Sequence, residues 1–286
     1  DERQEISKNN NYKTYKSEDE LLNDENVEAV LIATSNDLHK EQAIRALNAG
    51  KHVICEKPAT LNEKELDEII GVADKTGNVF MVHQNRRWDP DFLVIREMMK
   101  HKTIGDFIQI ESRVQGANGI PGDWRHDKKH GGGMLLDWGV HLLDQILFLI
   151  DSPVKRIFSD FSFVLGDDVD DGFVTHLTFQ NNLKVVVEVG TTNYVKLPRW
   201  YVKGTKGTAV INDWNLDGEV VIASDNETSA PKAIQAGVGL TKTMAPPSED
   251  ATIKLELPKP VVEYSSFYKN FHDVVRKKKE PIVKNV

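Results

Sequence analysis

The sequence predicts an α/β domain with a parallel sheet, followed by an α+β domain with an open antiparallel sheet. Near its start the chain alternates apolar segments (28–34, 52–56 and 78–84) with helical patterns. Strands separated by helices form βαβ units and hence a parallel sheet. Farther along, short segments alternate apolar and polar residues, as antiparallel strands do when one face is solvated. We therefore expect two domains, over 1–87 and 88–286.

The helices between the expected parallel strands have recognisable ends. The helical pattern over 38–50 stops at Gly50, because glycine favours the left-handed conformation that follows many helices. Thr60 and Glu63 have the spacing of a capping box, which predicts a helix from there to about Thr76.

In the second domain we expect helices, strands and one long loop region. Helical patterns cover 90–100, 131–150 and 266–278, and 224–260 reads as loop with little core. The strands are expected at 107–116, 158–165, 172–179, 183–192, 199–204, 207–213 and 218–224.

The composition limits the possible partners and compartments. The formal net charge of -8 argues against a nucleic-acid or anionic-membrane partner. The single cysteine, Cys55, excludes an internal disulfide framework and fits a reducing compartment. Without a run of apolar residues long enough to span a membrane, or a signal peptide at its start, the sequence predicts a cytoplasmic protein.

Polar residues follow each of the three expected parallel strands. Ligands bind beyond the carboxyl ends of such strands, which lie at one edge of the sheet. We therefore expect a ligand site that includes Thr34, Ser35, Asn36, Glu56, Lys57, Gln84, Asn85 and Arg86.

The tripeptide Glu56-Lys57-Pro58 ends the second expected strand. Pro58 cannot continue a sheet ladder, and it biases Lys57 toward an extended conformation. Lys57 would then be held at the edge where ligands bind. An ordinary charged turn is the alternative, and these three residues alone leave both interpretations open.

The expected helix over 131–150 is apolar in nearly every direction, yet Asp137, His141 and Asp144 lie on one stripe of it. Burying an acid and an imidazole costs on the order of several kcal/mol unless they are paired or face a polar cavity. His141 is therefore either a general acid/base held by a carboxylate or part of a satisfied Asp–His pair in the core. The three glycines at 131–133 allow a close approach by a ligand or another chain, or form a flexible entry.

Trp124, Arg125 and His126 precede the glycines. An aromatic ring, a cation and an imidazole suit stacking on, and hydrogen bonding to, a polyol or a nicotinamide ring, although a surface loop is the alternative. Asp137 and His141 could also share a metal with His126 and His130. A metal site would leave the Glu56-Lys57-Pro58 strand end unexplained, so we expect none.

Three stretches together resemble the Gfo/Idh/MocA family of NAD(P)-dependent oxidoreductases, which act on sugars, inositols and related polyols. VEAVLIATSNDLHKEQAIRALNAGKHVICEKP is similar to the family's fourth and fifth Rossmann strands and lysine motif. GGGMLLDWGVHLLDQ resembles its glycine-rich helix with Asp-x-x-x-His, and LPRWYVKGTKGTAVIND resembles part of its open antiparallel sheet. The resemblance runs over essentially the whole chain.

The resemblance implies a role for individual residues. It implies that Lys57 contacts the substrate hydroxyl and the nicotinamide side of the site, that His141 is the general acid/base, and that Asp137 binds substrate and supports His141. Trp124 and Arg125 would lie near the nicotinamide or the sugar, and we add His126 to the expected substrate site. The expected cofactor contacts are Ala33, Thr34, Asn36, His39, Glu56, Lys57, Asn85 and Arg86.

One feature of the family is absent from the sequence. The family opens with a strand and a G-x-G-x-x-G turn that binds pyrophosphate, and none of the 19 glycines forms that pattern. The resemblance implies that one βαβ unit of roughly 30 residues or more, and some C-terminal sequence, lie outside this chain.

From the residues and the resemblance we expect an enzyme that transfers a hydride between a secondary alcohol of a sugar, inositol or related polyol and NAD or NADP. A catalytically silent binding or regulatory protein on the same fold is the alternative. The alternating Val185, Val187 and Val189 suggest a sheet face that pairs with a second subunit. The family commonly assembles through this sheet, so we expect a homodimer or homotetramer.

Overall fold

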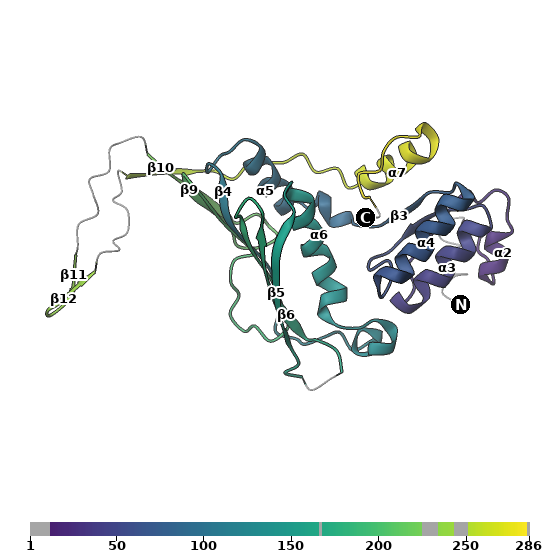
Figure 1. Ribbon diagram of the computed structural model, residues 1–286, viewed down its shortest axis with the longest axis horizontal. Coiled ribbons are helices and arrows are strands. Elements are labelled where there is room, and N and C mark those ends of the chain that lie inside the picture. The colour runs from purple at the N-terminus through teal and green to yellow at the C-terminus, as the bar shows by residue number, and fades with distance from the viewer. Residues whose placement is uncertain (1–11, 166–167, 225–233, 243–250, 285–286) are drawn as a thin grey trace. The chain divides into compact units, whose positions relative to one another are not determined.

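The computed structural model describes residues 12–165, 168–224, 234–242 and 251–284. The chain forms two compact units, shown in Figure 1. The first unit contains Asp1–Gln84, Lys129–Gly131 and Ser265–Val286, and the second contains Asn85–Lys128 and Gly132–Tyr264. Each unit is described by itself below.

The first unit is built on a three-stranded parallel sheet of strand order β1-β2-β3. Its strands are β1 (Ala29–Ile32), β2 (His52–Cys55) and β3 (Phe80–Val82). Helix α3 (His39–Asn48) connects β1 to β2, and α4 (Glu63–Thr76) connects β2 to β3. The parallel βαβ arrangement predicted from the sequence is confirmed. Two more helices, α2 (Glu18–Leu22) and α7 (Ser266–Lys277), belong to this unit.

The strands of the first unit form where apolar residues are buried. Val53, Ile54 and Cys55 of β2 are all buried, because β2 is the central strand. Helix α4 begins after Asn62, whose side chain accepts a hydrogen bond from the backbone N–H of Glu65 at 3.1 Å. The prediction that Thr60 caps this helix is therefore wrong by two residues, while its predicted end at Thr76 is confirmed.

The second unit is built on an eight-stranded sheet of order β13-β10-β9-β8-β4-β7-β6-β5. Among the strands that the structure describes, neighbours in this sheet run antiparallel, apart from the parallel pair β4 and β7. The bounds are β4 (Phe107–Gln115), β5 (Val154–Ser162), β6 (Gly172–Phe179), β7 (Lys184–Gly190), β8 (Trp200–Gly204), β9 (Gly207–Ile211), β10 (Gly218–Ala223) and β13 (Thr252–Leu255).

Two helices belong to the second unit, α5 (Pro90–Lys100) and α6 (Val140–Leu149), and α6 lies along one face of the sheet (Figure 1). The core of the unit lies on this face, where Leu142 and Ile146 of α6 join buried strand residues such as Ile110 and Trp200. None of the helices in the part of the chain that the structure describes has both the length and the apolar composition needed to cross a bilayer.

Val185, Val187 and Val189 also lie in this core, at 0% to 3% exposure. They are therefore covered by the unit itself, so the prediction that they form a face for a second subunit is wrong. Alternation shows that these residues share one face of a strand, but it does not show on which side the core lies.

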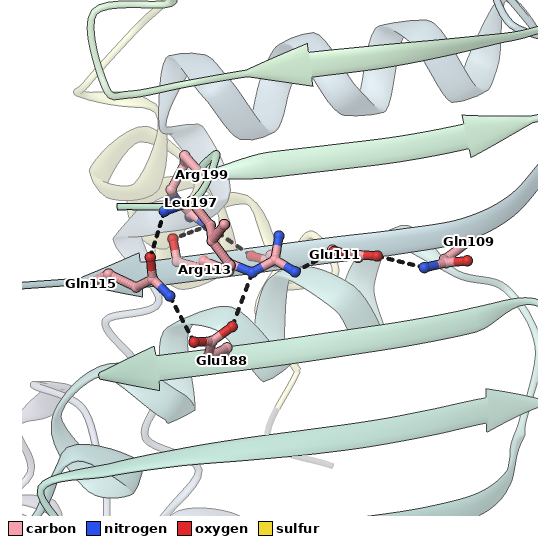
Figure 2. A network of polar contacts seen from close by, with 8 residues as sticks. Gln109, Glu111, Arg113, Gln115, Glu188, Leu197 and Arg199 are labelled. Carbon is pink, nitrogen blue, oxygen red and sulfur yellow. Dashed lines mark hydrogen bonds and ion pairs between the residues drawn. The ribbon is translucent and has the colours of Figure 1, made fainter. Parts of the chain in front are cut away.

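The opposite face of the sheet carries a polar network, shown in Figure 2. Arg113 donates to Glu188 Oε2 at 3.0 Å and also pairs with Glu111. Gln115 donates to Glu188 Oε1 at 2.6 Å and accepts from the backbone N–H of Leu197 at 2.8 Å. Strands β4 and β7 and the segment before β8 are thus joined through these side chains.

The region expected to be a long loop, 224–260, contains strands. These are the hairpin β11 (Ile234–Gly237) and β12 (Leu240–Lys242), and β13, which pairs with β10 at one edge of the large sheet. Residues 225–233 and 243–250 of the same region lie outside the described residues.

Candidate active site

The carboxyl ends of the three parallel strands lie at one edge of the first unit. Ile32, Cys55 and Val82, the last residues of β1, β2 and β3, stand opposite one another in the register. The residues that follow are Ala33-Thr34, Glu56-Lys57 and His83-Gln84, all but Ala33 polar. The structure thus brings together the strand ends that the sequence marks as a ligand edge. Asn85 and Arg86, expected at the same edge, belong to the second unit.

Glu56 is held by a residue that the sequence analysis did not single out, His83. The Nδ1 atom of His83 lies 2.6 Å from Glu56 Oε1, and the ring packs against Phe267 with centroids 4.6 Å apart. Burial works against the ionised form of Glu56, but the hydrogen bonds and charges of His83 and Lys57 together outweigh it, so the pKa of Glu56 is lowered. A carboxylate is therefore maintained next to Lys57.

Lys57 is half-buried and precedes a cis peptide bond to Pro58. Its backbone N–H donates to Glu56 Oε2 at 3.3 Å. The carbonyl oxygen of Pro58 lies 2.8 Å from Nδ1 of His39, whose Nε2 lies 3.1 Å from the carbonyl oxygen of Thr34. His39 is fully buried and links the chain after β1 to the chain after β2. Its expected contact with a cofactor stays a prediction.

Asn36 is buried at the start of the segment that leads into α3. Its side-chain N–H₂ donates to the carbonyl oxygen of Gly131 at 2.8 Å. Gly131 has φ +74, and a Cβ there would lie 2.4 Å from Leu61 and 3.0 Å from Cβ of Asn36. Glycine is required for this close approach.

A hollow of about 400 Å³ lies in the first unit beside β1. Its lining includes Ala33 and Thr34, two of the expected cofactor contacts, together with Tyr15, Leu31 and Gln42. Thr34 Oγ1 donates to Gln42 Oε1 at 2.7 Å. An apolar wall with hydroxyl and amide groups at the carboxyl end of a parallel strand fits part of a dinucleotide.

In the second unit, Asp137 and His141 lie on consecutive turns at the start of α6. Leu135–Gly139 forms a π-helical turn that continues directly into α6, a distortion often found at functional sites. Asp137 Oδ1 lies 3.4 Å from Nε of Arg125, whereas His141 is 5% exposed and lies edge-on to Trp138. An acid and an imidazole thus lie one turn apart, but Leu147 and Phe148 of α6 are exposed, so the expectation from the sequence that the helix is buried on every side is wrong.

The glycines at 132 and 133 allow other segments of the chain to approach the backbone closely. A Cβ on Gly132 would lie 2.3 Å from the carbonyl oxygen of Arg125, and one on Gly133 would lie 2.3 Å from a carboxylate oxygen of Asp170. Asp170 accepts a hydrogen bond from the backbone N–H of Leu135 at 2.8 Å and so fixes the first residue of the π-helical turn. Burial raises the pKa of Asp170, although its backbone hydrogen bonds oppose this. The sequence analysis did not identify Asp170.

Trp124, Arg125 and His126 form a short 3₁₀ turn. Asp123 caps it by accepting the backbone N–H of Arg125 at 3.0 Å and by pairing with the Arg125 side chain at 2.6 Å. The Arg125 guanidinium lies 4.6 Å from the centre of the Trp124 ring, and His126 Nε2 donates to the carbonyl oxygen of Ile120 at 3.0 Å. The turn is ordered by its own contacts and presents Arg125 to Asp137.

Arg86 lies against two indole rings next to His141. Its guanidinium is 4.4 Å from the ring centre of Trp138 and 5.3 Å from that of Trp214, and the two rings are 6.0 Å apart. The third residue on the predicted stripe, Asp144, is bound by both ends of the Arg87 guanidinium, at 2.7 and 2.6 Å. Asp144 is therefore an anchor of α6. Trp214 comes from the turn between β9 and β10, and no pattern in the sequence marks it as part of a site.

A buried polar cluster holds α6 against the sheet. Gln145 donates to the carbonyl oxygen of Arg86 at 2.6 Å and accepts from Arg199 Nη2 at 3.3 Å. Arg199 also donates to Ser112 Oγ at 2.7 Å and lies 3.2 Å from the carboxylate of Asp91, which accepts from Trp200 Nε1 at 2.7 Å. Because Gln145 lies one turn after His141, this cluster fixes the rotation of the helix that carries His141.

Within the described parts of the chain, no three or more His, Cys, Asp or Glu side chains are placed to hold a metal ion.

Known protein families match both parts of the chain. A family described as "Oxidoreductase family, NAD-binding Rossmann fold" matches residues 1–84, and the GFO/IDH/MocA C-terminal domain matches residues 92–210. A solved structure, an NAD-binding protein from Listeria innocua, is 60% identical with a TM-score of 0.93, over 99% of this chain and 82% of that chain.

Two relatives with a named activity are also similar. The myo-inositol 2-dehydrogenase of Thermotoga maritima is 33% identical over 75% of this chain and 65% of that protein. The scyllo-inositol 2-dehydrogenase (NADP(+)) IolW of Bacillus subtilis is 29% identical over 70% of this chain. The chain spans little more than half the length of several curated relatives that it matches, 56% in the case of IolW. Because the two family matches together cover most of the chain, the protein belongs to the Gfo/Idh/MocA family of oxidoreductases with an NAD-binding Rossmann fold.

Proposed function

We propose that this chain carries catalytic residues of an NAD(P)-dependent oxidoreductase that converts a secondary alcohol of a sugar, an inositol or a related polyol to the ketone, and back. The observation that carries the proposal is His141, a buried imidazole on a helix whose entry is distorted into a π-helical turn. The activities named for two inositol dehydrogenases among the relatives point to the same substrate class.

His141 acts as the general base in the oxidation and takes the proton from the substrate hydroxyl. A general base works best with its pKa near the working pH, which is where an imidazole titrates. Asp137, one turn earlier, binds the substrate and keeps the ring oriented, and Arg125 beside it prevents an isolated buried charge. In the reverse direction His141 returns the proton to the oxygen.

Lys57 stabilises the negative charge that develops on the substrate oxygen. An ammonium group placed where charge appears in the transition state lowers the barrier, and it does so without reorganisation at the moment of reaction. Glu56, whose pKa is lowered, places a negative charge next to Lys57.

NAD or NADP, when bound, supplies the hydride chemistry. Ala33 and Thr34 line the hollow beside β1 and fit the role of cofactor contacts. We assign the same role to Asn36, His39, Glu56, Asn85 and Arg86. Trp124, Arg125 and His126 belong to the substrate side of the proposal.

The test uses the complete protein and a panel of inositols, sugars and other polyols with NAD and with NADP, followed at the nicotinamide absorbance. Lys57→Met and His141→Gln should each lower turnover by about 10²-fold or more, while the affinity for the cofactor changes little. Lys184→Met and His176→Gln are matched controls, because both side chains are exposed on the sheet.

The controls should turn over at the rate of the unchanged protein. Near-normal turnover by either site variant would refute its assigned role. Cofactor binding without turnover of any compound in the panel would favour the catalytically silent alternative.

A further inference from the structure

Three of the chain's five tryptophans gather around the acid and the imidazole at the start of α6. Trp138 lies on the π-helical turn, and its ring centre is 6.1 Å from that of His141. The ring centre of Trp214 is 6.0 Å from that of Trp138. Trp124 stacks with Arg125, which pairs with the acid of this helix. Indole rings therefore flank the proposed base.

These three indoles are not part of the core. The core tryptophan, Trp200, is 0% exposed, whereas Trp214 is 41% exposed and Trp124 and Trp138 are half-buried. A single exposed apolar side chain needs no explanation, but a cluster of them marks a site of interaction, such as a ligand-binding groove. The cluster lies beside a general base, so a small-molecule ligand is the occupant that fits it.

Trp214 is held in place although much of it is exposed. The guanidinium carbons of Arg199 and Arg86 lie 4.8 and 5.3 Å from the centre of its ring, and cations at this distance attract an indole. Each guanidinium is in turn held by a carboxylate, that of Asp91 at 3.2 Å for Arg199 and that of Asp89 at 2.8 Å for Arg86. The position of the ring is thus fixed before any ligand binds.

The turn that carries Trp214 is closed by its own hydrogen bonds. The backbone N–H of Asn212 donates to the carbonyl oxygen of Asp217 at 2.6 Å, and the Asn212 side chain donates to the Asp217 carboxylate at 3.0 Å. The backbone N–H of Trp214 donates to the carboxylate of Asp213 at 2.8 Å. A ring on such a turn loses little conformational freedom when a ligand packs on it, which favours binding.

A ring-shaped polyol offers the surface that suits an indole. Where the hydroxyls of a six-membered ring are equatorial, its C–H bonds are axial, so the faces of the ring are apolar and its rim is polar. An indole packed on one face releases water from both surfaces. The rim hydroxyls then stay free to reach polar groups such as Asp137 and His141. An open-chain polyol has no fixed apolar face.

We propose that Trp214 determines the specificity of the substrate site by packing on the apolar face of a cyclic polyol, so that ring-shaped substrates are preferred to open-chain ones. Trp138, whose ring lies near those of both Trp214 and His141, links this contact to the base. The inference rests on the proposed function, and it assigns a role to the turn between β9 and β10.

The kinetic test uses the complete protein with saturating NAD or NADP. The ring-shaped compounds are myo-inositol and methyl α-D-glucopyranoside, and the open-chain compound is D-glucitol. Trp214→Ala should raise KM for the ring-shaped compounds about tenfold or more, because a large apolar contact is lost. It should leave kcat and the affinity for the cofactor within about twofold, because Trp214 transfers no proton. Trp214→Phe keeps an aromatic face and should recover most of the loss in KM.

A second measurement does not depend on turnover. Binding of each compound is measured by calorimetry in the presence of NADH or NADPH, because an alcohol and a reduced nicotinamide do not react with each other. The unchanged protein should bind the ring-shaped compounds about tenfold more tightly than D-glucitol, and Trp214→Ala should remove most of this difference. Phe158→Ala is the matched control, because Phe158 is 58% exposed on β5 at the far edge of the sheet, and it should change neither KM nor binding.

The outcomes separate this inference from the proposed function. Turnover of a ring-shaped compound with KM unchanged in Trp214→Ala would overturn the inference and leave the proposed function standing. Binding that depends on Trp214, without turnover, would support the inference and count against the proposed activity. If none of the ring-shaped compounds binds, both are wrong. A loss of cofactor affinity in Trp214→Ala would show that the ring acts through Arg86, which would also overturn the inference.

Discussion

The contact between Arg199 and Asp91 offers a direct test of how the second unit is held together. Both side chains are buried, at 4% and 1% exposure, and Asp91 Oδ2 lies 3.2 Å from Arg199 Nε. The same oxygen accepts from Trp200 Nε1 at 2.7 Å. Burial lowers the pKa of Arg199, and the charges of Asp91 and Asp89 oppose this, so the carboxylates offset the cost of burying a charged guanidinium.

Asp91→Ala removes the carboxylate and leaves a buried guanidinium. Breaking a buried ion pair in this way costs about 3–5 kcal/mol of unfolding free energy. For a unit of this size each kcal/mol corresponds to roughly 2–4 °C, so we expect Tm to fall by roughly 6–20 °C. Replacing both residues, with Asp91→Leu and Arg199→Met, should cost less than Asp91→Ala alone, because no unpaired charge then remains, although Trp200 Nε1 and Ser112 Oγ lose their partners.

The protein contains its own reporter for this measurement. All five tryptophans (Trp88, Trp124, Trp138, Trp200 and Trp214) lie in the second unit, so their fluorescence follows the unfolding of that unit. Asp151→Ala, at an exposed carboxylate after α6, is the control and should change stability by less than about 0.5 kcal/mol. A loss below about 1 kcal/mol for Asp91→Ala, or a double variant as unstable as the single one, would refute this account of the buried pair.

Three further predictions follow from the other contacts. Burial raises the pKa of the Cys55 thiol to about 12, so a thiol reagent near neutral pH should modify Cys55 only after unfolding. The lowered pKa of Glu56 stabilises the fold above the ordinary glutamate value of about 4.5, and this stabilisation is lost as the pH falls through the lowered value. Removing the carboxylate (Glu56→Gln), or its partner (His83→Ala), should therefore reduce the dependence of stability on pH in that acidic range. Gly133→Ala should destabilise the second unit by about 1–3 kcal/mol, because φ is +103 and the new Cβ would meet Asp170.

Each of these has an outcome that would contradict it. Rapid modification of Cys55 in the folded protein would show that the β2 thiol is accessible. If Glu56→Gln leaves the acid-unfolding curve unchanged, the contact between Glu56 and His83 is not the cause of the pH dependence of stability. Gly122→Ala is the control for Gly133→Ala, because a Cβ at Gly122 meets nothing within 4 Å. Equal stability of the two variants would contradict the argument from close approach.

The parallel sheet could be predicted because its signals are local. Each strand is a short apolar run that ends near polar residues, so the place of Thr34, Glu56 and Lys57 at the carboxyl edge of the sheet followed from topology alone. The acid and the imidazole of α6 were also visible, because polar residues are conspicuous in an apolar helix. The π-helical turn before α6 could not be predicted, because no sequence pattern distinguishes it from an ordinary turn of helix.

The residues that the sequence did not reveal make contacts between segments that lie far apart in the sequence. Asp91 and Arg199 come from different elements, and neither stands out in its own segment. Asp170 lies in an acidic run before β6, which reads as a solvated loop until the chain brings it to Leu135. A sequence pattern shows the periodicity of helices and strands and the residues that end them. Contacts such as Asp91 with Arg199 form only in the tertiary fold.

The chain passes between the two units four times, since Lys129–Gly131 and Ser265–Val286 return to the first unit. This order has a consequence for synthesis. The second unit has all of its residues once Tyr264 has left the ribosome, whereas the first unit, begun earlier, still lacks α7 and the Phe267 ring that packs on His83. We therefore expect the unit that begins later to complete its folding first, and a nascent chain stopped before α7 to leave His83 uncovered.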